Sequence, residues 1–373
     1  MKITKKIKVL FLVGNLRPAN GVSSFAMTYF RNIDHNKISI DFALLNDVKS
    51  PYYKEIRQNG GRIFILPPLH KTFQHIRACY KILRSNNYQI IHNNLLLSSI
   101  PMIYCAWLCK VPVRILQSHN TELSSIKWKE KRNKTFLPIL KCVSNAYLAC
   151  GIEAGKALFG NNDFNVIPNA IPFNKTFYDP IIRKDLRKKY NCKNKIVIGT
   201  VGRISFQKNP FFALDVIEKA YKKNPNIEYW WIGSGELDEK VKNYVQKKGL
   251  NKFVRFFGSR TDVQKLYQAM DVFFLPSLFE GLPITAIEAQ ASGLPSLISS
   301  SVTRELEYTD LVKFLSLNSS LDTWAENLIS QSERNPVRQN YINDLRSSEF
   351  YAPNAANKLS LNYMRFLKFK DGK

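Results

Sequence analysis

Short apolar runs alternate with amphipathic stretches along most of the chain, and this alternation restricts the possible folds more than any other feature. A short apolar run followed by a helical pattern is typical of a βα unit, and successive βα units build a parallel sheet covered by helices. In the first half of the chain, the expected strands are 9–13, 63–66, 90–92, 114–116, 147–149 and 166–167. The expected helices there are 23–33, 51–59, 72–86, 97–109, 129–145 and 152–159.

The same alternation starts again after a stretch at 170–195 that contains several prolines and asparagines, which we interpret as a linker. The expected strands there are 196–201, 229–232, 254–257, 272–275 and 296–299. The expected helices are 210–223, 236–249, 262–270 and 283–292, followed by helical segments without strands at 321–348 and 354–370. The pattern predicts two doubly wound α/β domains with a ligand-binding cleft between them. We place these domains at 1–172 and 173–352, and expect a C-terminal helix at 353–373 to pack back toward the first.

The composition is that of a folded protein large enough for two domains. Of its 373 residues, 45% are apolar and 23% are charged, which distinguishes the chain from disordered proteins. The formal net charge of +26 indicates a polyanionic partner, such as nucleic acid, an anionic membrane surface or a phosphorylated ligand. A general lysine bias of the genome is the alternative. The six cysteines form no CxxC pair and no disulfide framework, so we expect a reducing, cytoplasmic environment.

Two apolar segments are too short to act as membrane signals. Residues 9–13 follow several lysines, but the run is shorter than the apolar region of a signal peptide, and Pro18 follows in place of a cleavage site. We therefore expect a buried strand there. The stretch 95–109 ends at Lys110 and falls short of the roughly 20 residues that a membrane span needs.

The segment 271–295 combines an apolar strand, a turn and a helix with two glutamates. Pro283 suits the start of a helix and Gly293 its end, and a helix N-terminus after such a strand is a ready phosphate site. Glu280 lies in the turn, whereas Glu288 borders the apolar face of the helix, so the two carboxylates can bind the vicinal hydroxyls of different parts of one ligand. Two alternatives stay open: Glu280 as an ordinary acid at a helix N-terminus, and Glu288 as the partner of a lysine or arginine.

Together with four other segments, this one resembles the retaining glycosyltransferases of family 4. Glu280-Gly281-Leu282-Pro283 with Glu288 is similar to the E-x7-E motif of that family. The other similar segments are a Gly-Arg…Lys-Asn phosphate loop at 201–210, an interdomain segment at 166–171 with Ala170 in place of the usual glycine, a nucleotide-side turn at 257–263, and a strand end at 114–120 that is similar to the exopolysaccharide and capsule branch. The resemblance implies the GT-B fold, in which two Rossmann-like domains face each other across a cleft.

The resemblance also implies a role for each matched residue. Arg203 and Lys208 would bind the donor diphosphate. Glu288 would bind the ribose hydroxyls, and Glu280 the transferred sugar. His119, at the carboxyl end of its strand, would contact the donor from the first domain, although a lone histidine is more often structural. The remaining expected donor-site residues are Gly202, Gly233, Arg260, Gly281, Leu282, Pro283 and Gly21, which stands beside Asn20 where the family usually has two adjacent glycines.

The implied reaction moves a hexose or N-acetylhexosamine from a nucleotide sugar, with a UDP-sugar favoured, to a saccharide acceptor, often a lipid-linked one. It would retain the anomeric configuration and serve the synthesis of a surface polysaccharide. The chain has no Asp-x-Asp motif of the kind that metal-dependent transferases use. Because Arg203, Lys208 and a helix N-terminus can neutralise the leaving diphosphate, we expect metal-independent activity without a cofactor.

The run 127–134 alternates basic residues with a tryptophan. This pattern suits an anionic membrane surface, so we predict peripheral attachment to the inner leaflet, with a solvated charged helix as the alternative. The residues concerned are Lys127, Trp128, Lys129, Lys131, Arg132 and Lys134.

Two other functions fit parts of the sequence. A nucleotide-sugar epimerase or hydrolase of the GT-B fold would also use the two glutamates and the phosphate loop. A non-enzymatic nucleic-acid-binding protein would account for the charge, but the chain lacks the recognition motifs of such proteins, so we expect no nucleic-acid partner.

Overall fold

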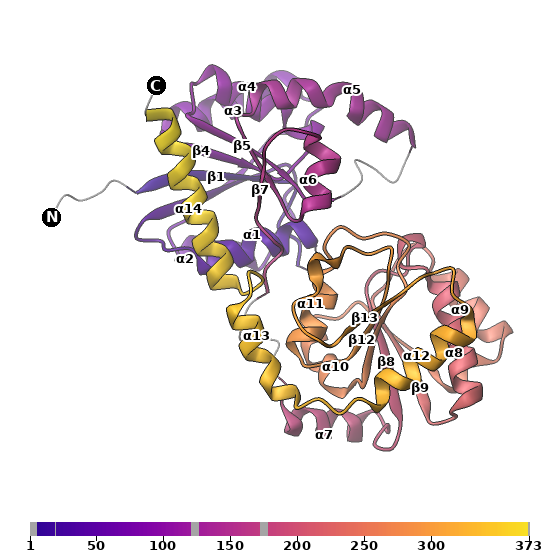
Figure 1. The fold of residues 1–373 in the computed structure, drawn as a ribbon. Helices are drawn as coiled ribbons and strands as arrows, with labels where there is room; N and C mark the ends of the chain where they lie inside the picture. Colours follow the sequence, from indigo (N-terminus) through magenta and orange to yellow (C-terminus); the bar gives the residue numbers. More distant parts are fainter. Residues whose placement is uncertain (1–5, 19, 121–126, 172–177, 372–373) are drawn as a thin grey trace. The chain divides into compact units, whose positions relative to one another are not determined.

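The computed structural model describes residues 6–18, 20–120, 127–171 and 178–371, which form two compact units (Figure 1). The first unit comprises Met1–Ala170 and Ala352–Lys373, and the second comprises Ile171–Tyr351. The chain thus leaves the first unit once and returns to it with its last helix, whereas the sequence analysis placed the two changes after residues 172 and 352.

In its described residues, the first unit contains a parallel seven-stranded sheet with the order β3-β2-β1-β4-β5-β6-β7. Its strands are β1 (Ile7–Val13), β2 (Ile38–Leu44), β3 (Ile63–Ile65), β4 (Ile90–Asn93), β5 (Val113–Ser118), β6 (Ala146–Ala149) and β7 (Asn165–Val166). Its helices are α1 (Gly21–Asn32), α2 (Tyr52–Gln58), α3 (Thr72–Asn86), α4 (Ile100–Leu108), α5 (Lys127–Val143), α6 (Ile152–Phe159) and α14 (Ala352–Asp371), with a 3₁₀ turn at Leu97–Ser99. The central strand β1 is an almost continuous apolar run, as expected for a strand covered on both faces.

Helices cover both faces of this sheet. Buried side chains of α1, α2 and α14 pack with one face, and those of α3, α4, α5 and α6 pack with the other. Helix α14 contacts α1, and Figure 1 shows it running along the first unit. The first unit therefore needs the twenty residues of α14 to complete its core.

The second unit has a parallel six-stranded sheet with the order β10-β9-β8-β11-β12-β13. Its strands are β8 (Ile196–Val201), β9 (Ile227–Ile232), β10 (Val254–Gly258), β11 (Val272–Leu275), β12 (Ser296–Ser299) and β13 (Val312–Leu315). Its helices are α7 (Pro180–Lys189), α8 (Pro210–Lys223), α9 (Asp238–Lys247), α10 (Val263–Ala269), α11 (Ile284–Ala291), α12 (Leu321–Glu333) and α13 (Tyr341–Ser347). Single 3₁₀ turns lie at Phe206–Lys208, Leu250–Lys252, Arg304–Leu306 and Arg338–Asn340. Two apolar clusters on either side of the sheet form its core.

The interpretation of 170–195 as a linker was wrong in part, because this stretch contains helix α7. Asp179 caps the helix by accepting hydrogen bonds from the amides of Ile181, at 2.7 Å, and Ile182, at 3.3 Å. Two arginines of α7 pair with the carboxylate of Asp271 at 2.5 and 2.9 Å. A segment that looks like a linker in sequence is thus held by a partner far away in the chain.

Two strands, β2 and β13, were not predicted from the sequence. Both apolar runs are interrupted by a charged residue, Asp41 in β2 and Lys313 in β13. Asp41 is buried and its carboxylate accepts a hydrogen bond from Arg62 Nη2 at 2.6 Å, which explains how a strand interior can hold an acid. The predicted helical segment 321–348 is interrupted between α12 and α13.

Among the residues that the structure describes, none of the helices combines the length and the apolar character needed to cross a membrane.

Candidate functional site

The carboxyl edge of the second sheet has a topological switch point at β8. Strand β8 lies between β9 and β11, so the chain turns to opposite sides of the sheet after these neighbouring strands. Open α/β sheets bind their ligands at this point. The loops that follow β8, β9 and β11 begin at Gly202, Gly233 and Pro276 and contain most of the predicted donor-site residues.

Two glycines let the loops after β8 and β9 approach each other closely. Gly202 has φ 156° and Gly233 has φ 137°, a region that favours glycine. A methyl carbon on Gly233 would lie 2.0 Å from the carbonyl oxygen of Gly202. The amide of Gly233 also donates a hydrogen bond to the carbonyl of Gly258 at 2.8 Å, which joins the end of β10 to the same edge.

Lys208 and Glu280, predicted for different parts of a donor, form an ion pair across two loops. Lys208 Nζ lies 2.5 Å from Glu280 Oε1, and the two side chains are only 12% and 9% exposed. Ser277 Oγ donates to the same carboxylate oxygen at 2.8 Å, and Gln207 Nε2 donates to the other oxygen at 3.0 Å. The carboxylate of Glu280 is therefore held in one orientation by three donors.

Ser277 and Gln207 were not predicted from the sequence to be functional residues. Gln207 lies in the segment 201–210 and Ser277 in the segment 271–295. The signal that could have found them is that they lie close in sequence to Lys208 and Glu280, on two loops that meet at the switch point. Neither loop predicts its partner from sequence alone.

Arg203 stands exposed at the start of the loop after β8. Its side chain has no ion-pair or hydrogen-bond partner within the described ranges, so its charge is available to an anion. The hydroxyl oxygens of Ser205 and Thr285 are buried there and have no hydrogen-bond partner among the same residues. A ligand rich in phosphate oxygens and hydroxyls would satisfy such groups.

Helix α11 begins directly after the loop that follows β11. It runs over Ile284–Ala291 with Pro283 as its N-cap, one residue shorter at each end than predicted. Leu282 and Pro283 are buried, whereas Gly281 is half-buried. The turn therefore brings the backbone around Gly281 toward the surface at the helix N-terminus, where the partial positive charge of the helix favours an anion.

Two other predicted donor-site residues, Glu288 and Arg260, have hydrogen-bond partners within the second unit. The hydroxyl of the buried Tyr267 donates to Glu288 Oε2 at 3.1 Å, an interaction that the sequence did not suggest. Arg260 makes two hydrogen bonds of 2.8 Å to the carboxylate of Asp262. The charge of Arg260 is thus balanced by its neighbour, which distinguishes it from Arg203.

In the first unit, His119 follows β5 at the carboxyl edge of the sheet. Its Nε2 lies 2.9 Å from Asn94 Oδ1, so it donates a hydrogen bond to that oxygen and Nδ1 is left as the acceptor. The ring also contacts Phe25 of α1 edge-on, with 4.9 Å between the ring centroids. Asn94, which follows β4, was missed by the sequence analysis and sets the orientation of the imidazole.

A second histidine, His92, is buried behind His119. Its Nδ1 accepts from the hydroxyl of Tyr363 in α14 at 2.6 Å, and its Nε2 donates to Gln117 Oε1 at 3.0 Å. Burial lowers the pKa of His92 to about 4. Burial and, to a lesser extent, the proximity of the His92 imidazole lower the pKa of His119 to about 3. Both imidazoles are therefore neutral at pH 7.

These two histidines predict a loss of stability in mild acid. In the unfolded chain both titrate near pH 6.5, so the unfolded state binds more protons below that pH and the free energy of unfolding falls as the pH is lowered toward 4. At about pH 5.5 we expect roughly 1 to 3 kcal/mol less stability than at pH 7, measured by urea unfolding. The His92→Gln variant should show a shallower dependence, and equal unfolding free energies at the two pH values would contradict the prediction.

Gly21, the predicted donor-site residue of the first unit that stands beside Asn20, lies at the start of a helix. It is the first residue of α1, and Asn20 caps that helix with φ −94° by accepting from the amide of Ser23 at 3.2 Å. Asn20 therefore has an extended backbone, which does not require the glycine that the family usually has at this position. A methyl group on Gly21 would meet no atom within 4 Å, so neither the fold nor a close neighbour requires glycine here.

The predicted membrane residues lie at the start of α5. Trp128 is 62% exposed, and the guanidinium of Arg132 lies over its ring at 5.4 Å. Lys134 Nζ pairs with Glu130 at 2.7 Å. The exposed basic side chains are Lys131, Arg132 and Lys134, whereas the side chains of Lys127 and Lys129 lie outside the described residues.

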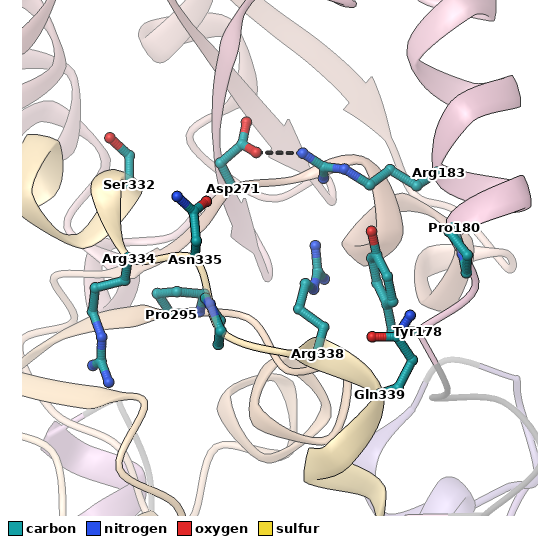
Figure 2. Close-up of a pocket in the computed structure, with 11 residues that line it drawn as sticks. Tyr178, Pro180, Arg183, Asp271, Pro295, Ser332, Arg334, Asn335, Arg338 and Gln339 are labelled. Atoms are coloured by element: carbon teal, nitrogen blue, oxygen red, sulfur yellow. Dashed lines mark hydrogen bonds and ion pairs between the residues drawn. The ribbon is translucent and has the colours of Figure 1, made fainter.

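A separate hollow of about 290 Å³ lies at the amino ends of β11 and β12, away from the switch-point loops. Figure 2 shows Arg183 and Arg338 in it together with Asp271 and Tyr178. Arg183 pairs with Asp271 at 2.5 Å, and Arg338 donates to backbone carbonyls. Because these arginines are already satisfied by the protein, the hollow is a structural feature and not the donor site.

Comparison with known proteins agrees with this geometry. The family model of the group 1 glycosyl transferases matches residues 182–347, which include the Lys208–Glu280 pair. An uncharacterized glycosyltransferase of Methanocaldococcus jannaschii, MJ1607, is 30% identical over 277 residues, which cover 67% of this chain and 69% of that protein. The chain belongs to the group 1 glycosyl transferases.

Two further proteins are similar to this glycosyltransferase. A UDP-Gal:α-D-GlcNAc-diphosphoundecaprenol α-1,3-galactosyltransferase of Escherichia coli is 30% identical over 257 residues, covering 64% of this chain and 66% of that protein. The crystal structure of Anabaena HepE in complex with UDP and glucose has a TM-score of 0.77 over 96% of this chain and 99% of HepE, at 16% identity. The predicted family and the predicted two-domain GT-B fold are therefore confirmed.

Proposed function

We propose that this glycosyltransferase moves a hexose or N-acetylhexosamine from a UDP-sugar to a lipid-linked saccharide, with retention of the anomeric configuration, during synthesis of a surface polysaccharide. The observation that carries the proposal is the buried pair of Lys208 and Glu280 at the switch point, with Arg203 exposed beside it. When a donor enters, the cations of Arg203 and Lys208 can bind its diphosphate, and the carboxylate of Glu280 can accept a hydrogen bond from a sugar hydroxyl.

Each residue has a distinct task in this proposal. Arg203 and Lys208 bind the diphosphate and stabilise the negative charge that develops on it as the bond between the anomeric carbon of the sugar and the diphosphate breaks. Glu280, oriented by Ser277 and Gln207, accepts hydrogen bonds from the hydroxyls of the transferred sugar. Glu288, held by Tyr267, does the same for the ribose.

The first unit supplies the remaining parts of the proposal. A neutral His119, with its Nε2 hydrogen committed to Asn94, offers Nδ1 as an acceptor for a donor hydroxyl. Because cationic side chains and the helix N-terminus neutralise the leaving diphosphate, the reaction needs no metal and no cofactor. The enzyme would act in the cytoplasm at the inner face of the membrane.

The proposed acceptor is supported by relatives. The E. coli relative is named for an undecaprenyl-diphosphate-linked acceptor and a UDP-galactose donor. HepE was solved with UDP and glucose. These names favour a UDP-sugar donor and a lipid-linked acceptor over the alternatives that the sequence left open.

A screen of the purified protein tests the proposal. UDP, GDP and their sugars are added singly, and both the melting temperature and the release of nucleotide are measured with and without a lipid-diphosphate saccharide. A UDP-sugar should raise the melting temperature, because a ligand that binds only the folded state stabilises it. Transfer should require the acceptor, and the anomeric configuration of the product is read by NMR.

The outcomes separate the alternatives. Turnover of the donor at the same rate without acceptor would favour the epimerase or hydrolase. A melting temperature unchanged by every nucleotide, together with nucleic-acid binding that falls steeply with salt, would favour the nucleic-acid-binding protein.

A further inference from the structure

Helices α3, α4 and α5 of the first unit carry nine exposed large apolar side chains on their outer side. They are Phe73, Ile76 and Tyr80 on α3, Tyr104, Trp107 and Leu108 on α4, and Trp128, Phe136 and Ile139 on α5. Helix α3 packs beside α4, α4 packs beside α5, and all three cover the same face of the sheet (Figure 1). We call this set of nine side chains the α3–α5 face.

The exposure of this face does not come from loose packing. On α3 the side chains of His75, Cys79 and Leu83 are buried toward the sheet, and they repeat at helical spacing. Phe73, which is 77% exposed, and Tyr80 lie on the other side of the same helix. A large exposed apolar area with a well-packed inner side marks an interaction surface.

The charge on and next to α3 and α4 is of one sign. The sequence has no aspartate or glutamate between Glu55 and Glu122, but has eight lysines and arginines there. Exposed cations stand next to the apolar residues at Arg77, Lys81, Arg84 and Lys110. The guanidinium of Arg84 lies 5.8 Å from the Tyr80 ring centre, so long cationic side chains border the aromatic rings.

On α5, Glu130 is the only acid, and it is paired with Lys134. The α3–α5 face therefore combines exposed apolar side chains with a border of four neighbouring cations, Arg77, Lys81, Arg84 and Lys110, which have no acidic partner among the described residues. Aromatic rings and long cationic side chains are the combination found where proteins meet the headgroup region of a bilayer.

We infer that the α3–α5 face docks on an anionic lipid bilayer, with its aromatic and aliphatic side chains in the interface and its cations on the lipid headgroups. The inference rests on the proposed function in one respect, since a lipid-linked acceptor would be presented at that bilayer. It extends the predicted membrane segment 127–134 to α3 and α4, for which the sequence predicted helices but no membrane contact.

Two other occupants fit the face less well. A second copy of the chain would place two positive borders against each other, which like-charge repulsion disfavours. Single-stranded nucleic acid would use the cations and the rings, but it has no use for Ile76, Leu108 and Ile139. An anionic bilayer can accommodate these aliphatic side chains and can also bind the cations through its headgroups.

Flotation of the full-length protein with vesicles tests the inference. Vesicles of phosphatidylcholine alone are compared with vesicles that also contain phosphatidylglycerol. Two variants remove each component of the face: Lys81→Glu/Arg84→Glu and Trp107→Ser/Leu108→Ser. Each should lower binding to the anionic vesicles by at least about tenfold, because each cation near the surface contributes measurably to binding and the apolar pair supplies insertion.

Matched variants in the second unit control for general effects of charge and exposure. Lys240→Glu/Lys242→Glu reverses two exposed lysines of α9, and Ile181→Ser removes a side chain that is 69% exposed on α7. Both should bind vesicles as the unaltered protein does. Brominated lipids quench the fluorescence of tryptophans that insert into the bilayer. We expect less quenching in Trp107→Phe, which keeps an aromatic ring at this position.

Several results would overturn the inference. These are equal binding to neutral and anionic vesicles, unchanged binding by both face variants, displacement from vesicles by an oligonucleotide that binds more tightly, or a stable dimer that is lost in the face variants. Nucleotide release from the donor without vesicles reports on the donor site separately. A protein that turns over a donor but ignores vesicles contradicts only this inference, and the reverse result contradicts only the proposed function.

Discussion

Replacing Lys208 by methionine is expected to lower kcat/KM for the nucleotide-sugar donor by roughly two to three orders of magnitude, because a charge-assisted bond to the leaving diphosphate is lost in a poorly solvated site. The change also removes one of the three donors that hold the Glu280 carboxylate. Initial rates of nucleotide release at several donor concentrations give kcat and KM separately. We expect the loss mainly in kcat, since the developing charge is greatest in the transition state.

A lysine that forms a surface ion pair provides the control. Lys219 in α8 pairs with Asp322 at 3.2 Å, and both side chains are about half exposed, so Lys219→Met should leave kcat/KM unchanged. Circular dichroism and a melting curve show whether each variant is folded. In the double variant Lys208→Met/Glu280→Gln, the loss of transition-state stabilisation calculated from kcat/KM should be smaller than the sum for the two single variants, because the residues act as a pair. A Lys208→Met enzyme that is folded and keeps kcat/KM within about tenfold would contradict the assigned role.

Much of the fold was legible in the sequence because parallel strands leave a strong pattern. Strands β8, β11 and β12 have the predicted bounds, since each is an apolar run that ends at a turn. The strands that were missed, β2 and β13, each contain a charged residue. The charge of Asp41 is tolerated because Arg62, in a different part of the chain, reaches it, and periodicity in one segment cannot show such a partner.

The candidate site was legible in part for a similar reason. Motifs locate Lys208 and Glu280 along the chain, and each lies on a loop at the carboxyl edge of the sheet as expected. That the two side chains meet at 2.5 Å depends on the order of strands β8 and β11, which no local pattern contains. The same holds for Tyr267 and Glu288, and for Asn94 and His119. Gly21 marks the opposite case, where a glycine that matches a family pattern occupies a position that the fold itself leaves open.

Replacing Arg338 by methionine should have the largest effect on stability. Its guanidinium donates to the carbonyls of Ser292 at 2.9 Å and of Tyr267 and Met270 at 3.0 Å, near the ends of α10 and α11. The last carbonyls of a helix lack the usual intrahelical donors, and a buried cation at this end donates to them and balances the negative end of the helix dipole. Burial, first of all, lowers the pKa of Arg338 to about 9, so the group stays charged at pH 7.

Without Arg338, three backbone carbonyls lose a hydrogen bond, although that of Met270 keeps one of 2.8 Å from Arg183 Nη1. We expect this to cost roughly 2 to 5 kcal/mol. Urea unfolding followed by tryptophan fluorescence measures this loss. Arg334 gives a matched control, because it lines the same hollow in Figure 2 but pairs at the surface with Asp310 at 2.9 Å. Arg334→Met should cost less than about 1 kcal/mol. If the two variants were equally stable, or if phosphate stabilised the unaltered protein but not Arg338→Met, the arginine would be an anion ligand and not the cap of two helices.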